Sequence, residues 1–141
     1  MSKSFHAAWI YTLLGLAAGL FYRSYTKAKD FDGTTQLAVT HTHLLALGML
    51  MFLVVLALTA VLPIAELKLF TLFFWFYNAG LVVTVAMMVV HGIIQVNGDD
   101  GEKPAIAGIA GLGHILITVG LLHLFLALRK GIAAKQPAIA G

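Results

Sequence analysis

Four long apolar stretches, separated by short polar segments, make up most of the chain. They cover about residues 5–22, 36–62, 69–96 and 104–128, and each has at least the roughly 17 residues that a helix needs to cross a bilayer. The polar segment 23–35, the helix-breaking Pro63 with the turn after it, and the polar segment 97–103 separate them. The pattern predicts an all-α, integral membrane four-helix bundle. It forms a single transmembrane domain over residues 1–141 with a short C-terminal tail at 129–141.

The composition supports a protein whose main partner is the lipid bilayer. Hydrophobic residues make up 60% of the chain and charged residues 11%, whereas soluble domains have about 45–50% and 25%. This excludes a disordered chain and a nucleic-acid-binding module, so we expect no nucleic-acid partner. The chain has no cysteine, which excludes disulfides, thiolate metal sites and cysteine nucleophiles.

The basic residues between the spans indicate the orientation in the membrane. An even number of spans places both termini on one side, and the cytoplasmic side of a membrane protein carries the excess of Lys and Arg. The terminal side would carry Lys3, Lys68, Arg129, Lys130 and Lys135. The opposite side would carry Arg23, Lys27, Lys29 and Lys103. We therefore expect both termini in the cytoplasm.

Six histidines all lie in or at the edge of the predicted spans: His6, His41, His43, His91, His114 and His123. Ionisable residues within a bilayer are costly and mark functional sites by default. A simpler explanation for any one of them is a hydrogen bond between helices. At 1.5 Å of rise per residue, four of them share the leaflet opposite the termini, namely His41, His43, His91 and His114.

The helical angle separates two of these residues. His41 and His43 are two positions apart, or about 200° around a helix, so they cannot face the same centre. One points into the bundle, and the other faces a second cofactor, a neighbouring subunit or lipid. The sequence does not decide which. Gly111, one turn before His114, leaves room for a flat ring, although glycines in spans also serve plain helix packing.

These features lead to haem b as the expected cofactor. Histidines on facing helices of a bundle can ligate haem iron, and without a CxxCH motif the haem would be non-covalent. We expect His114 and one of His41 and His43 as axial ligands, with His91 and Gly111 also at the site. The function would be electron transfer or the handling of a diatomic gas, with a donor such as a quinol or a cytochrome. No independent catalytic motif is present, so an enzyme would be a haem-dependent oxidoreductase.

Two other functions fit the same residues. His41, His43 and His114 offer three imidazoles, which suit zinc or copper, so the protein is alternatively a binder or transporter of one of these metals. A structural or assembly protein without a cofactor would use its histidines as hydrogen-bond partners between helices. In each case we expect a homo-oligomer, a dimer or a trimer.

The segment 40–48, with His41 and His43, resembles the His-x-His helix of the haem–copper oxidase and nitric oxide reductase superfamily. The resemblance implies that the first histidine ligates a high-spin haem and the second a low-spin haem, on opposite faces of one helix. This chain departs from that pattern because it has four spans rather than twelve and no adjacent pair of histidines for copper. A homotrimer would be needed to imitate the three four-helix arcs of that superfamily.

Over nearly its whole length the chain also resembles a family of small bacterial four-span membrane proteins of unknown function. The segments that carry this resemblance are residues 19–23, 41–45, 74–81 and 108–114. The resemblance implies a multi-pass protein of the bacterial cell (inner) membrane. It implies no activity.

Overall fold

A computed structural model describes residues 2–99 and 104–135, and every regular element in these ranges is helical. Four of its helical segments are long and apolar enough to cross a membrane, which confirms the all-α, four-span prediction. The second of these segments is built from three consecutive elements. The elements are α1 (Ser2–Ala28), α2 (Leu37–His43), the π-helix η1 (Leu44–Leu50), α3 (Met51–Val61), α4 (Lys68–Val96) and α5 (Pro104–Lys135).

Two predicted helix ends were wrong. Helix α1 continues through residues 23–28, which were expected in the loop, and α5 continues beyond Arg129 and Lys130 to Lys135. Both extensions contain basic side chains, which have good helix propensity and stabilise the C-terminal end of a helix through its dipole. In both helices the polar residues end the apolar stretch, but the helix continues beyond them. Residues 100–103 of the predicted loop 97–103 and residues 136–141 of the predicted tail lie outside the described ranges.

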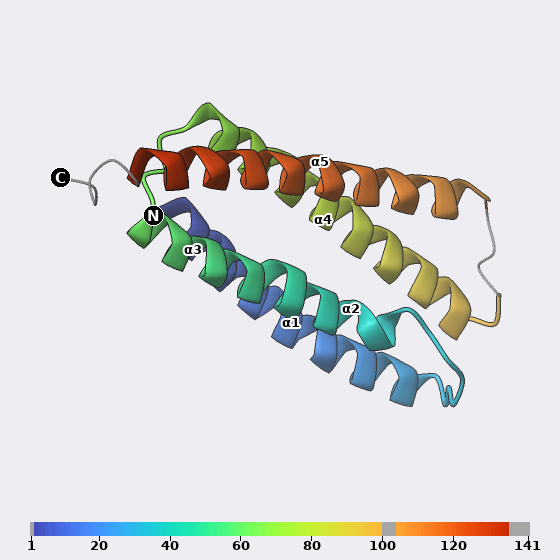
Figure 1. The fold of residues 1–141 in the computed structure, drawn as a ribbon. Helices are drawn as coiled ribbons and strands as arrows, with labels where there is room; N and C mark the ends of the chain where they lie inside the picture. Colours follow the sequence, from blue (N-terminus) through green and yellow to red (C-terminus); the bar gives the residue numbers. More distant parts are fainter. Residues whose placement is uncertain (1, 100–103, 136–141) are drawn as a thin grey trace.

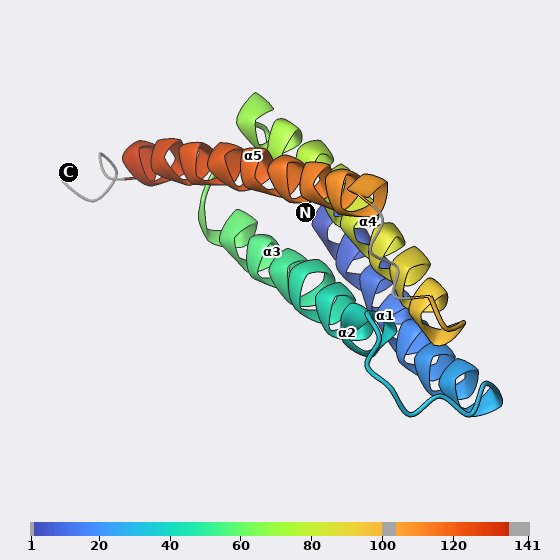
Figure 2. The ribbon, with the colours of Figure 1, turned by 90° about the vertical axis from the view of Figure 1, so that its right-hand side faces the viewer.

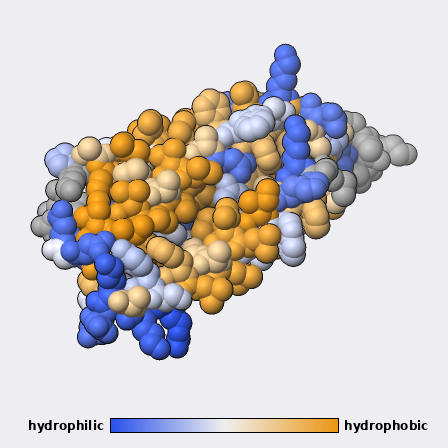
Figure 3. Space-filling view, turned by 180° about the vertical axis from the view of Figure 1, so that it is seen from behind, coloured by the Kyte–Doolittle hydropathy of each residue, from blue (hydrophilic) through white to orange (hydrophobic). Residues whose placement is uncertain are grey.

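The helices form two antiparallel pairs. One pair is α1 with the span α2–η1–α3, and the other is α4 with α5 (Figures 1 and 2). The start of α1, the α3–α4 turn and the end of α5 gather at one end of the molecule, here called the terminal end. The other end carries the α1–α2 and α4–α5 connections and is called the loop end. A largely apolar surface separates groups of hydrophilic residues near the two ends (Figure 3), as expected for a protein that faces lipid.

The pair α4 and α5 packs backbone against backbone at three glycines. A Cβ atom added at Gly80 would lie 2.6 Å from the carbonyl oxygen of Gly113, and one at Gly120 would lie 2.8 Å from the backbone nitrogen of Tyr77. Small residues allow such close approach between helices in lipid, where van der Waals packing replaces the hydrophobic effect as the driving force. Helix α5 is therefore fixed against α4.

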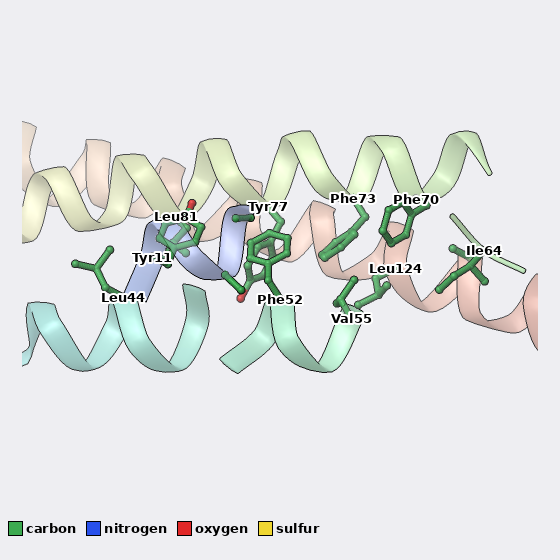
Figure 4. Packing of buried hydrophobic residues seen from close by; sticks show 13 residues of the cluster. Tyr11, Leu44, Phe52, Val55, Ile64, Phe70, Phe73, Tyr77, Leu81 and Leu124 are labelled. Carbon is green, nitrogen blue, oxygen red and sulfur yellow. The ribbon is translucent and has the colours of Figure 1, made fainter. Parts of the chain in front are cut away.

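An aromatic cluster joins the two pairs in the middle of the molecule (Figure 4). Phe52 of α3 is fully buried. Its ring stacks on Tyr11 of α1 with centroids 5.9 Å apart and meets Tyr77 of α4 edge-on at 5.8 Å. Such offset and edge-to-face pairs are the preferred arrangements of aromatic rings. The cluster fixes the distance between the pairs at mid-depth.

The second span contains a π-helical segment that begins directly after His43. At its end the backbone N–H of Met51 reaches the carbonyl of Ala46, five residues earlier. A π-helical segment shifts the phase of the following turns relative to an α-helix, and such segments occur often at functional sites. Gly48, in the middle of η1, packs against the ring of Tyr11, and a Cβ atom there would lie 2.4 Å from that ring.

Candidate cofactor-binding site

A cavity of about 610 Å³ lies between α2, α4 and α5 in the half of the molecule towards the loop end. The ribbons of α2 and α5 diverge towards the loop end (Figure 1). Six of the eleven described residues that line the cavity are apolar, and three of the five polar ones are histidines from three different helices. The described residues that line it are Gln36, His43, Thr84, Met87, Met88, His91, Pro104, Ile106, Ala107, Ala110 and His114.

The two histidines of the His-x-His motif point to different sides of the second span. His43 lines the cavity, whereas His41 lies against α1, where a Cβ atom added at Gly19 would be 3.8 Å from the His41 Cβ. The Nδ1 atom of His41 is buried and has no hydrogen-bond partner in the part of the chain that the structure describes. The sequence left this direction open, and the packing of α1 against α2 assigns His43 to the cavity.

His43 and His114 have the same hydrogen-bond arrangement. Nδ1 of His43 lies 2.9 Å from the carbonyl oxygen of Val39, and Nδ1 of His114 lies 2.9 Å from that of Ala110. Because a carbonyl only accepts, a neutral ring in this position carries its proton on Nδ1 and keeps a lone pair on Nε2. A metal-ligating histidine commonly has this arrangement, with the outer ring nitrogen bound to a backbone carbonyl.

The same local bond occurs at a histidine outside the cavity. Nδ1 of His123 lies 2.7 Å from the carbonyl oxygen of Val119, and the ring stacks on Phe76 with centroids 5.8 Å apart. The bond to the preceding turn therefore satisfies a helical histidine in an apolar setting wherever it lies. What distinguishes His43 and His114 is that both also line one cavity with His91.

Gly111 is not among the described residues that line the cavity. It is exposed, and a Cβ atom added there would meet nothing within 4 Å. The small side chains on the cavity side of α5 are Ala107 and Ala110. Gly111 thus lies beside the cavity wall, one turn from His114.

Thr84 lines the cavity, although it was not predicted as a site residue. Tyr77, Thr84 and His91 recur every seven residues along α4, and that spacing was the available signal. Its side chain is 2% exposed, and its hydroxyl has no hydrogen-bond partner among the described residues. The hydroxyl oxygen has almost no exposed surface and faces Gly113 of α5, where an added Cβ atom would lie 2.5 Å from it. It therefore lies in the contact between α4 and α5 rather than at the surface of the cavity.

Gln36 also lines the cavity and was not predicted as a site residue. Its backbone N–H donates to the Gln95 side-chain oxygen at 2.9 Å, which ties the start of the second span to the end of α4. Gln36 precedes His43 by seven residues, or two helical turns. That spacing was the available signal for placing both on one face.

The three histidines proposed as metal ligands do not come together. Within residues 2–99 and 104–135, no group of three or more His, Cys, Asp or Glu side chains is arranged to hold a metal ion. Because His41 faces α1, it cannot join His43 and His114 around one ion. Any site for a bare zinc or copper ion would need other donors.

Comparison with known proteins places the chain in one family. No curated protein and no solved structure matches it. Residues 1–131 match the model of the family described as "Protein of unknown function (DUF2871)". This match includes the first three spans and most of the fourth, with His43, His91 and His114. The chain is a four-helix, multi-pass membrane protein that belongs to the DUF2871 family.

Proposed function

We propose that the protein binds haem b in the cavity at the loop end and uses it for electron transfer or for handling a diatomic gas. The observation that carries this proposal is the convergence of His43, His91 and His114, from three helices, on one largely apolar cavity. Its volume of about 610 Å³ lies within the range of about 300–1,000 Å³ typical of ligand sites.

The lining fits the chemistry of a porphyrin. Met87, Met88 and Ile106 offer apolar, adaptable walls for the ring. His43 and His114 would hold the haem iron through Nε2, because their Nδ1 atoms are bonded to backbone carbonyls. Bound haem iron supplies one-electron chemistry or a site for a diatomic gas. The protein's part is to hold the ring, set the tautomers of its ligands and exclude water.

The opposite directions of His41 and His43 support the resemblance to the His-x-His helix of haem–copper oxidases. In that arrangement the two histidines serve different cofactors, so His41 would belong to a second haem or to a contact with another subunit of a dimer or trimer. Because His41 and His43 point in opposite directions, they cannot bind the same ion. This weighs against a zinc or copper site made of His41, His43 and His114. The proposal places the protein in the bacterial inner membrane with both termini in the cytoplasm.

An optical spectrum of the detergent-purified protein tests the proposal. The protein is expressed with added haem precursor and measured oxidised, then reduced with dithionite, then with carbon monoxide. We expect a Soret band with sharp reduced α and β bands, and a shift with carbon monoxide if one axial position is open to gas. A flat visible spectrum would overturn haem binding.

Single substitutions then test the ligands. His43→Ala and His114→Ala should each lose most of the haem per protein. His123→Ala is the matched control, because His123 makes the same bond to its preceding turn but lies outside the cavity. Unchanged haem content in both ligand variants would show that the haem binds elsewhere.

A further inference from the structure

A second cavity, of about 440 Å³, lies between α1 and α4 in the half towards the terminal end. Several of its outer residues, including Trp75 and Val82, are largely exposed on helices that cross the membrane. Exposed faces of such helices meet lipid, so the groove opens sideways into the hydrocarbon. The described residues that line it are Lys3, His6, Ala7, Ile10, Tyr11, Leu14, Phe74, Trp75, Asn78 and Val82.

A polar pair lies deep in this groove. The Tyr11 hydroxyl donates to Oδ1 of Asn78 at 2.8 Å, and Nδ2 of Asn78 donates to the Phe74 carbonyl at 2.7 Å. The amide nitrogen carries two hydrogens and the phenol oxygen can also accept. One N–H donor and one acceptor therefore remain for a ligand oxygen, in a setting where polar groups are costly.

The depth of the Tyr11–Asn78 pair separates phospholipids from lipids that carry polar atoms into the hydrocarbon region. Tyr11 is eight residues from Lys3, and Asn78 is ten residues from Lys68, which places the pair roughly 12–15 Å along the helices from the terminal end. The head group of a phospholipid would stay at the membrane surface near Lys3. Only its acyl chains would reach the depth of Asn78. A ligand that matches the groove must therefore carry oxygen atoms into the hydrocarbon region.

The walls around the pair are aromatic. Tyr11, Phe74 and Trp75 all line the groove, and aromatic rings stack favourably on other flat rings. We propose that this groove binds the ring of a lipid-soluble quinone or quinol. A ring oxygen accepts from the second N–H of Asn78, a quinol hydroxyl also donates to the Tyr11 oxygen, and the apolar tail leaves over Ile10, Leu14 and Val82 into the bilayer.

The groove and the haem cavity lie on different faces of α4. Val82 lines the first and Thr84 the second, two residues and about 200° apart on the same helix. A quinone is a lipid-soluble electron carrier, which is the class of redox partner that a haem within the membrane would need. That role rests on the proposed function, whereas the binding of the quinone does not.

Photolabelling tests the binding directly. The protein in lipid nanodiscs is irradiated with a short-tailed azidoquinone, and the adducts are located by mass spectrometry. We expect adducts on the segments that contain Tyr11 and Asn78. An excess of short-tailed ubiquinone should reduce them at least tenfold, and an excess of phosphatidylglycerol should leave them unchanged.

Two variants and a matched control define the site. Trp75→Leu and Asn78→Leu should each reduce the competed labelling at least tenfold. Trp75 is 64% exposed, so Trp75→Leu removes the aromatic wall without opening the core. Trp9→Leu changes another exposed tryptophan (55%) that does not line the groove, and it should label like the natural protein.

Equal labelling of Trp75→Leu and Trp9→Leu, or competition by phosphatidylglycerol, would overturn the quinone site. The Soret absorbance is measured on the same samples. Competed labelling without a Soret band would keep the quinone site and reject only haem binding. A Soret band without competed labelling would reject the quinone site alone.

Discussion

The hydroxyl of Tyr77 donates a hydrogen bond of 2.9 Å to the carbonyl oxygen of Leu47, and this bond joins α4 to the π-helical segment of the second span. Tyr77 is 1% exposed. The segment η1 starts one residue after His43. The tyrosine therefore stabilises the turn that follows the cavity histidine.

Replacing Tyr77 with Phe should lower the stability of the folded protein by about 0.6 kcal/mol, and by at most about 1.7 kcal/mol. These are the mean and maximum measured for hydrogen bonds between transmembrane helices. The ring stays in place, so only the bond to Leu47 is lost. Unfolding in mixed micelles of detergent and dodecyl sulfate measures the change.

Tyr25→Phe is the matched control for this prediction. The Tyr25 hydroxyl accepts a bond from Asn97 at an exposed position near the loop end, where water replaces the lost partner. Its effect on the free energy of unfolding should be smaller. An equal loss in both variants would mean that the Tyr77 bond has no special role.

Two glycines that lie two residues apart in α5 should differ in how replacement by alanine changes the free energy of unfolding. A Cβ atom at Gly113 would lie 2.5 Å from the Thr84 hydroxyl oxygen and 3.0 Å from the Gly80 carbonyl, whereas one at Gly111 would meet nothing within 4 Å. Gly113→Ala should lower the free energy of unfolding by about 1–3 kcal/mol, as overpacking does. Gly111→Ala should be neutral or raise it by up to about 1 kcal/mol, because alanine is the better helix former. Equal effects would show that α4 and α5 do not pack as described.

The direction of the His-x-His pair gives a prediction for cofactor content. His43→Ala should lose the haem of the cavity, because its ring lines that cavity. His41→Ala should keep it, since His41 faces α1 near Gly19. The measurement is the Soret absorbance per protein of the two purified variants. Loss of the same band in His41→Ala alone would place the haem between α1 and α2 instead.

The sequence predicted the number of spans and the clustering of histidines because both follow from period and depth along single helices. It also predicted that His41 and His43 face apart. Their absolute directions depend on where α1 and α4 pack, which is a tertiary property. Gly111 and Gly113 look equivalent as sequence, although only Gly113 meets a backbone.

The π-helical segment was not predicted, because residues 44–50 carry no local signal that separates a π-helix from an α-helix. The Leu47 carbonyl within this segment accepts a hydrogen bond from Tyr77 of α4, a contact between helices that the sequence does not reveal. The extended ends of α1 and α5 were missed for another reason. The length of an apolar stretch reflects the thickness of the hydrocarbon core of the membrane. The helix propensity of the residues that follow decides where the helix ends.

Replacing Thr84 with Val should raise or leave unchanged the stability of the cofactor-free protein. Within residues 2–99 and 104–135 the buried hydroxyl has no hydrogen-bond partner, so removing it relieves a desolvation cost of about 1–3 kcal/mol. Destabilisation of the cofactor-free Thr84→Val variant would show that the hydroxyl has a partner within the protein.

The orientation in the membrane can be tested with single cysteines because the natural chain has none. Ser24 and Ala133 are exposed near the ends of α1 and α5, on opposite sides of the bilayer. The distribution of basic residues predicts the α5 end in the cytoplasm. In intact spheroplasts, a membrane-impermeant maleimide should therefore label Ser24→Cys at once, and Ala133→Cys only after permeabilisation. The reverse pattern would move the cavity at the loop end to the cytoplasmic half of the membrane and reverse the predicted topology.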